Sequence, residues 1–348
     1  MIYSILPIDR CHWCAEWKHT HGVHRLLAVR VVKSEVFLDR SAPEPVIGSG
    51  QALIRPTRVL IGQADVLACR GENNFEGILG YQFVGVVEQA EDPSWIGARV
   101  VGNPNIADPS SELARRGLAN HDPDRAILGL RNRDGCLAER FVLEIRNLTK
   151  VPEEIDDDRA AFASALAAAV HASQIVHMEG KPFITVLGEG LSGLLCAQVM
   201  TKLNASVRLL GTNADRLELC AKWGIKHRHL DDVGRRQDQD VVIDTTMDPK
   251  SLEIAMKMVR PRGRIVLKTD PIPSLNSIEP IDYAPIIANE LQVFGARCGH
   301  IAEGLNAMST GGIDLSGLIT KRFKFEDAIN ALRTAQDEEQ IAVIVDMP

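Results

Sequence analysis

The chain has 348 residues, of which 45% are hydrophobic and 24% charged, a balance typical of a soluble globular protein of about two domains. The net charge of −7 argues against a nucleic-acid binder and against adhesion to an anionic membrane. No apolar run reaches the roughly 18 residues of a membrane span, and the N-terminus lacks a signal-peptide pattern. Seven scattered cysteines favour reduced thiols, so we expect a cytoplasmic protein.

The first half of the chain predicts a β-rich domain. Short apolar runs punctuated by Gly and Pro indicate strands over residues 26–32, 51–61, 83–88 and 98–101. A polar stretch follows at 103–134, with a short helical patch at 111–116. Such a long excursion in a compact domain is usually functional or vestigial.

The second half predicts alternating strands and helices. A helix over 158–178 precedes strands at 182–187, 206–210, 240–244 and 264–268, separated by helices at 194–203, 214–223 and 250–259. This alternation is typical of βαβ units and of a doubly wound parallel sheet, so the fold class is α/β. The last residues predict a strand at 292–295, a helix at 325–335 and a strand at 341–345.

A glycine-rich turn joins the strand at 182–187 to the helix that follows it. Gly188, Gly190 and Gly193 have the G-x-G-x-x-G spacing of a dinucleotide fingerprint. Leu191 and Ser192 open the helix, where free amide groups and the helix dipole favour a pyrophosphate. The alternative is a tight βα turn without a ligand.

The end of the next strand bears on the choice of dinucleotide. An acidic residue normally stands there to bind the adenosine ribose hydroxyls, but this chain has Gly211, followed by Thr212 and Asn213. The glycine leaves room for a 2′-phosphate, which Thr212, Asn213 and Arg216 could contact. The sequence therefore favours NADP over NAD, although Arg216 could equally be a solvated helix residue.

Taken together, these segments resemble the medium-chain dehydrogenase/reductase superfamily, in its zinc alcohol dehydrogenase-like branch, from about residue 25 onward. The motifs that carry the resemblance stand at 79–80, 83–87, 97–100, 134–139, 188–193, 260–263 and 318–320. The resemblance implies a GroES-like β-rich domain at 24–152 and 300–348, a Rossmann domain at 153–299, and an N-terminal extension at 1–23. It also implies a homodimer, with 292–295 as the edge strand.

The zinc ligands of that branch do not carry over to this chain. The positions of the catalytic ligands and the proton-relay hydroxyl fall on Gly62, Ala64, Tyr81, Gln82 and Ser164. The four cysteines of the structural zinc lobe fall on Asp108, Ser111, Ala114 and Asp122. A zinc site needs about three or four Cys, His or carboxylate ligands. We therefore expect no zinc at either place.

Without zinc, the resemblance implies direct hydride transfer from a nicotinamide to a small-molecule substrate, namely a quinone, a carbonyl or an activated double bond. Tyr81 is the candidate proton donor, and Gln82, Ser164 and Lys268 are the other candidate catalytic residues. Thr245 and Thr246 are expected to line the cofactor cleft, and Thr269 lies beside Lys268. The alternative is a non-catalytic homologue that binds a dinucleotide or acts as a scaffold.

The N-terminal extension contains Cys11-His12-Trp13-Cys14, followed by three further histidines. A C-x-x-C with nearby histidines can bind a peripheral zinc ion. The alternative is an extension without such a role.

Overall fold

The computed structural model describes residues 25–176, 178, 180–234, 236–246, 248, 250–268 and 281–348. The Cys/His-rich extension and Thr269 lie outside these residues. The described chain forms two compact units, of which the first ends at residue 151 and is completed by 320–348, while the second comprises 152–319. Within the described residues, no helix has both the length and the apolar character that crossing a membrane requires.

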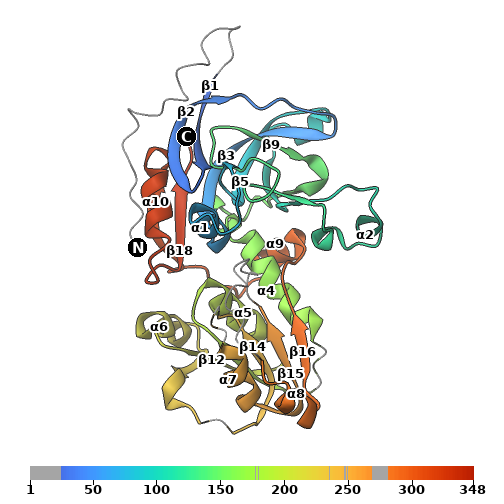
Figure 1. Ribbon diagram of the computed structural model, residues 1–348, viewed down its shortest axis with the longest axis vertical. Helices are drawn as coiled ribbons and strands as arrows, with labels where there is room; N and C mark the ends of the chain where they lie inside the picture. Colours follow the sequence, from blue (N-terminus) through green and yellow to red (C-terminus); the bar gives the residue numbers. More distant parts are fainter. Residues whose placement is uncertain are drawn as a thin grey trace. The chain divides into compact units, whose positions relative to one another are not determined.

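The first unit is built on antiparallel sheet, and the end of the chain returns to complete it (Figure 1). The larger sheet has the order β10 (Leu148–Lys150), β6 (Arg99–Gly102), β5 (Gln82–Ala90), β3 (Gln51–Ile61), β18 (Ala342–Asp346) and β17 (Ile319–Lys324), with β9 (Phe141–Glu144) also paired to β3. A smaller sheet has the order β2 (Glu35–Pro43), β1 (Arg25–Val32) and β4 (Gly77–Ile78). Helices α1 (Gln63–Cys69) and α10 (Ala328–Thr334) complete the unit. The expected strands at 26–32, 51–61, 83–88 and 98–101 are present, whereas β2 and α1 were not predicted.

Strand β3 accommodates a proline in its interior. Pro56 lacks the amide hydrogen that a sheet ladder needs, and the pairing with β5 shifts register between Pro56 and Arg58. Gly85 lies opposite, where a Cβ atom would stand 2.7 Å from Cγ2 of Ile54 and 2.8 Å from the Arg55 carbonyl oxygen. A bulge and a glycine together therefore let the strand continue past the proline.

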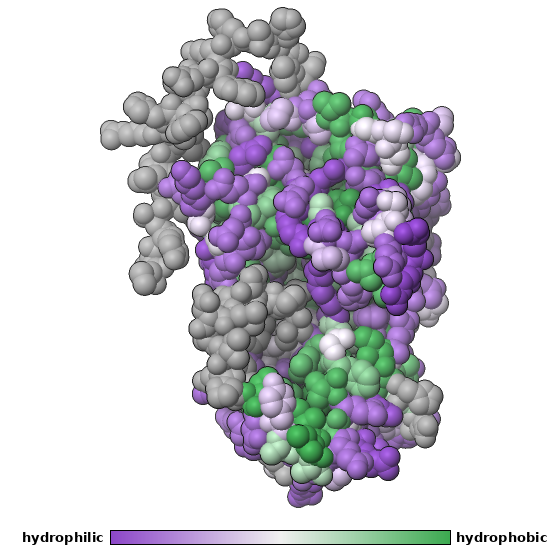
Figure 2. Space-filling model, turned by 45° about the vertical axis from the view of Figure 1, so that its right-hand side comes forward, coloured by the Kyte–Doolittle hydropathy of each residue, from purple (hydrophilic) through white to green (hydrophobic). Residues whose placement is uncertain are grey.

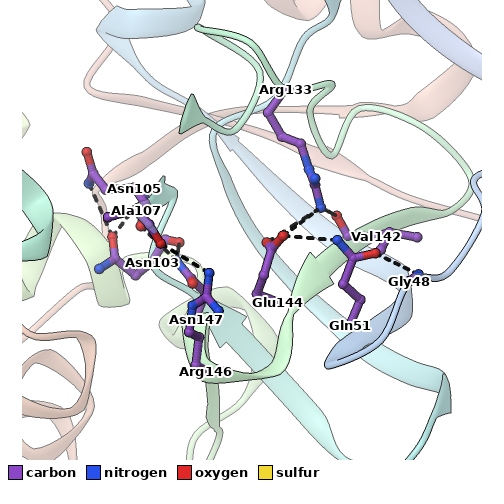
Figure 3. A network of polar contacts seen from close by, with 10 residues as sticks. All are labelled: Gly48, Gln51, Asn103, Asn105, Ala107, Arg133, Val142, Glu144, Arg146 and Asn147. Carbon is purple, nitrogen blue, oxygen red and sulfur yellow. Dashed lines mark hydrogen bonds and ion pairs between the residues drawn. The ribbon is translucent and has the colours of Figure 1, made fainter. Parts of the chain in front are cut away.

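The polar excursion at 103–134 is a folded lobe. It contains the pair β7 (Asn105–Ile106) and β8 (Ala126–Ile127) and the short helix α2 (Glu112–Arg115). Figure 3 shows how Asn147 anchors the start of the lobe, where its Nδ2 donates hydrogen bonds of 2.8 Å to the carbonyl oxygens of Asn103 and Asn105. Beside it, Arg146 donates to the Ala107 carbonyl oxygen at 3.1 Å. Side chains from outside the lobe thus hold the segment by which the chain enters it.

The second unit contains a parallel sheet, which confirms the predicted α/β class. Its order among the described residues is β13 (Lys226–His229), β12 (Ser206–Gly211), β11 (Phe183–Leu187), β14 (Gln239–Asp244), β15 (Val259–Leu267) and β16 (Gln292–Gly295). The connecting helices are α5 (Leu191–Thr201), α6 (Ala214–Lys222), α7 (Ser251–Met258) and α8 (Ala284–Ala288). Counted along the unit, this is the doubly wound order 3-2-1-4-5-6, which places a crevice between the carboxyl ends of β11 and β14.

Residues 300–319 belong to the second unit and not, as expected from the resemblance, to the first. The expected helix at 158–178 is two helices, α3 (Asp157–Ala160) and α4 (Ala163–Ile175), and α9 (Ile301–Ser309) packs against α4. A Cβ atom at Gly299 or Gly304 would overlap the backbone of α4 at Ala167 or Ala163. This close packing of α9, which hydrophobic periodicity does not reveal, places the return to the first unit at 320.

Candidate functional site

The glycine turn lies at the switch point of the parallel sheet. Gly188 follows β11 with φ of +98°, and a Cβ atom there would stand 2.8 Å from Oγ1 of Thr245 and 3.0 Å from Cγ2 of Thr246. The Thr245 hydroxyl donates to the Leu187 carbonyl oxygen at 2.7 Å. The structure therefore brings together the glycine turn and the two threonines that the sequence analysis placed in the cofactor cleft.

The other two glycines of the turn differ in what surrounds them. Gly190 precedes α5, has φ of −71°, and a Cβ atom there would meet no atom within 4 Å. At Gly193 a Cβ atom would overlap the Gly188 carbonyl oxygen. Gly193 thus permits close packing within the turn, while Gly190 leaves open space at the start of α5, beside the amide groups of Leu191 and Ser192. This is the space that a pyrophosphate needs, so the turn fits a dinucleotide.

A carboxylate lies at the tip of β12, although the sequence has glycine there. Oε1 of Glu189 accepts hydrogen bonds from the Thr212 amide at 3.0 Å, the Thr212 hydroxyl at 3.2 Å and the Asn213 amide at 2.9 Å. A Cβ atom at Gly211 would overlap the Glu189 carboxylate. The premise that no acid stands at this tip is therefore wrong, because the glycine turn supplies one. Arg216 lies in α6, where its amide donates to the Asn213 side chain at 3.1 Å.

Lys268 is buried at the end of β15, and its charge acts on Cys196 in the middle of α5. Its side chain is 6% exposed, and its amide donates to the Asp244 carbonyl oxygen at 2.7 Å, which places it at the carboxyl edge of the sheet. Burial raises the pKa of the Cys196 thiol to about 11, while the Lys268 charge and a hydrogen bond to Ser192 act in the opposite direction. The Lys268 ammonium group therefore lies close to α5. No carboxylate of the described chain forms an ion pair with it.

In the first unit, Asp65 joins the two segments on which the resemblance placed zinc ligands. Its Oδ2 accepts from the Gly62 amide at 2.9 Å and its Oδ1 from the Gly80 amide at 3.1 Å. Asp65 is fully buried, and this burial raises the pKa of its carboxyl group to about 6 against the two hydrogen bonds. A carboxylate held in this way positions backbone, and both of its oxygens are already engaged.

The amide of Gln82 occupies the space beside Gly62. A Cβ atom at Gly62 would stand 3.1 Å from Nε2 of Gln82 and 3.8 Å from Oδ2 of Asp65. Oε1 of Gln82 is buried without a hydrogen-bond partner, which leaves it able to bind a ligand or water. Tyr81 precedes Gln82 and is half-buried. Ser164 is the second residue of α4 and belongs to the second unit.

The residues present do not fit a zinc ion. The expected ligand positions are occupied by Gly62, Tyr81, Gln82 and Ser164, none of which has a thiol, imidazole or carboxylate group. In the part of the chain that the structure describes, no three His, Cys, Asp or Glu side chains are grouped as metal ligands.

Hydrogen bonds hold the lobe on which the resemblance placed the structural zinc. Ser111 caps α2, where its hydroxyl oxygen accepts from the Ala114 amide at 3.1 Å. The same hydroxyl donates to Asp122, and this bond, with the Asp124 amide, lowers the pKa of the Asp122 carboxyl group. Asp108 accepts from the Ser110 amide at 2.8 Å. Three of the four expected ligand positions are thus part of turns and caps.

Comparisons with known proteins find relatives of this chain by sequence and by fold. Residues 48–153 match the alcohol dehydrogenase GroES-like domain. The L-threonine 3-dehydrogenase of Escherichia fergusonii is 27% identical over 325 residues, which are 86% of this chain and 94% of that protein.

Two solved structures share the fold. A dehydrogenase from Sinorhizobium meliloti 1021, described as zinc-binding and bound to NADP, has a TM-score of 0.84 at 22% identity, and the match covers 93% of this chain and 99% of that one. An alcohol dehydrogenase from Escherichia coli CFT073, complexed with NADH, has a TM-score of 0.83 at 20% identity and covers 93% of this chain and 100% of its own.

Proposed function

The chain belongs to the medium-chain dehydrogenase/reductase superfamily, and from this premise we propose that it is an alcohol dehydrogenase-like oxidoreductase that works without catalytic zinc. In this proposal it uses NADH or NADPH to reduce a carbonyl, a quinone or an activated double bond. The proposal rests on the open space at Gly190, which lies between the end of β11 and the start of α5. No side chain caps the first amides of α5, so they can bind a pyrophosphate. A turn that served packing alone would not need this space.

When bound, the nicotinamide supplies a hydride, and the substrate gains this hydride together with one proton while the cofactor becomes NAD(P)⁺. The chain must therefore donate the proton and bind the developing negative charge. We assign the proton to the phenol of Tyr81, because a phenol can donate to an oxyanion without a metal. Gln82, the next residue, offers a buried amide oxygen that has no hydrogen-bond partner.

Activity should survive removal of zinc. We expect protein purified with a strong zinc chelator to oxidise NADH or NADPH in the presence of a benzoquinone, an α,β-unsaturated ketone or an aldehyde. Tyr81→Phe, which removes only the hydroxyl, should lower kcat more than it changes cofactor affinity. Cofactor binding without turnover on any of these substrates would favour the non-catalytic alternative, and loss of turnover on chelation would contradict zinc independence.

We assign to Lys268 the role of a counter-charge for the phosphate groups of the dinucleotide. A buried ammonium group without a carboxylate partner favours an anion nearby. Lys268→Met keeps the length of the side chain and removes the charge, so it should weaken dinucleotide binding by about tenfold or more. Lys222→Met, on the exposed side of α6, is the control and should have no effect on binding. Equal dissociation constants for wild type and Lys268→Met would contradict this role.

We also propose that the chain forms a homodimer through β16, at the edge of the parallel sheet. Exposed apolar side chains lie on and before this strand, with Val293 39%, Tyr283 62% and Ile287 76% exposed. Figure 2 shows hydrophobic residues gathered in the lower part of the view. An edge with unpaired amides and apolar side chains is suited to pairing with a second copy.

Sedimentation should therefore give a dimer at micromolar concentration. Val293→Asp should shift the equilibrium to monomer, because it places a carboxylate on the pairing edge. Val46→Asp is the matched control, since Val46 is 89% exposed in the first unit and should leave the dimer intact. A wild-type monomer under these conditions would contradict the proposal.

Two observations bear in opposite directions on the choice between NADPH and NADH. Gly211 favours NADPH because it removes the usual acid from the tip of β12. Glu189 places a carboxylate at that tip from another segment.

A further inference from the structure

We infer that Glu189 selects NADH over NADPH by occupying the place where a 2′-phosphate would bind; this inference rests on the proposed dinucleotide function. Glu189 is the second residue of the glycine turn, so its backbone lies beside the pyrophosphate space. Its side chain reaches the tip of β12, where the hydroxyls of the adenosine ribose bind in sheets of this order. One residue thus links the two parts of the dinucleotide site.

Two of the three residues that the sequence offers to a 2′-phosphate, Thr212 and Asn213, already donate to Glu189. The amides of Thr212 and Asn213 and the Thr212 hydroxyl all donate to Oε1 of Glu189, at 2.9–3.2 Å. A 2′-phosphate carries a charge of about −1.5 to −2 at neutral pH. It would have to displace a carboxylate from three donors and then lie beside a like charge. NADPH binding is therefore opposed twice, by lost hydrogen bonds and by repulsion.

The same carboxylate suits the free hydroxyls of NADH. All three hydrogen bonds go to Oε1, and within the described chain Oε2 accepts none. Oε2 lies against Gly211, where any side chain would overlap it. A ribose hydroxyl can donate to this remaining oxygen, which is a charge-assisted hydrogen bond. Glycine at position 211 therefore leaves space for the Glu189 carboxylate. Because the carboxylate fills this space, a 2′-phosphate cannot bind in it.

Glu189→Gln separates charge from structure. The glutamine carbonyl oxygen can still accept from Thr212 and Asn213, while the negative charge is gone. If Glu189 only ties the turn to the loop after β12, this variant should leave both affinities unchanged. If its charge selects the cofactor, the variant should bind NADPH more tightly. Glu218→Gln is the matched control, because it makes the same change of side chain at an exposed position of α6.

The experiment measures dissociation constants of NADH and NADPH by nicotinamide fluorescence for wild type, Glu189→Gln and Glu218→Gln. We expect wild type to bind NADH at least about tenfold more tightly than NADPH, and Glu189→Gln to reduce that ratio about tenfold or more. Unfolding midpoints of the variants show that they remain folded. A wild type that prefers NADPH, or a ratio unchanged in Glu189→Gln, overturns the inference while dinucleotide binding stands. If no variant binds either cofactor, the proposed function fails and the inference with it.

Discussion

Replacing Gly190 by valine is expected to abolish binding of NADH and NADPH while the protein stays folded. The backbone φ of −71° suits any residue, and the space around a Cβ atom is open, so the substitution meets no clash in the free protein. The cost to folding should be about 1 kcal/mol, because valine is a poorer residue than glycine before a helix. With a dinucleotide bound, the valine side chain would lie where the pyrophosphate approaches the backbone. Fluorescence titration measures the loss of binding, and thermal unfolding shows the intact fold.

Gly234→Val provides the matched control for this variant. Gly234 also lies in the second unit, and a Cβ atom there meets nothing within 4 Å. The same change in side chain should leave dinucleotide affinity unaltered at this position. If Gly190→Val binds as tightly as wild type, the pyrophosphate does not lie at this turn. Gly193→Val would be a poor test, because its side chain would overlap the Gly188 carbonyl oxygen and disturb the fold.

The free energy of unfolding is expected to fall between pH 4 and 7 because of the buried carboxyl group of Asp65. The pKa of Asp65 is raised from 3.8 to about 6 on folding, so between these values the folded state binds more protons than the unfolded state. Its contribution to stability is therefore fully present below about pH 4 and is lost as the pH rises through 6. The shift corresponds to about 3 kcal/mol of unfolding free energy. Denaturant titrations from pH 4 to 7 should show wild type losing this amount relative to Asp65→Asn, which does not titrate.

Asp108→Asn is the control, because the pKa of Asp108 is lowered on folding whereas that of Asp65 is raised. Hydrogen bonds from Ser110 lower the pKa of the Asp108 carboxyl group, so its contribution is present above the unfolded pKa and is lost as the pH falls. The free energy of unfolding of wild type relative to Asp108→Asn should therefore increase with pH. Relative to Asp65→Asn, the free energy of unfolding of wild type should decrease with pH. If the difference in unfolding free energy between wild type and Asp65→Asn stays constant between pH 4 and 7, the pKa of the Asp65 carboxyl group is not raised on folding.

Local pattern was sufficient to predict the α/β class and the glycine turn. The order strand, G-x-G-x-x-G and helix is a contiguous signal, and each glycine has a conformational or steric reason that acts on its neighbours. Helix α1 was missed because its seven residues are too few to show a helical period, and strand β2 because the polar residues that follow Leu38 hide its alternation. Residues 300–319 were assigned to the first unit because the packing of α9 on α4 depends on Gly299 and Gly304, which carry no periodic signal.

The acid at the tip of β12 could not be predicted in the same way. The acid that binds the adenosine ribose is usually the residue at the end of the second strand, where this chain has Gly211. The carboxylate comes instead from Glu189, which stands 22 residues earlier in the chain and was visible only as an unspecified position of the glycine motif. A glycine where an acid is expected, with an acid inside the turn, is the sequence signal that could have revealed it. The place of the Gln82 amide beside Gly62 is likewise a tertiary contact.

Calorimetric titration of chelator-treated wild-type protein with NADH decides whether the second unit binds a nicotinamide dinucleotide at the turn 188–193 without zinc. We expect saturable binding of about one NADH per chain, which is lost in Gly190→Val and retained in Gly234→Val. Absence of saturable binding at millimolar NADH and NADPH would contradict this expectation.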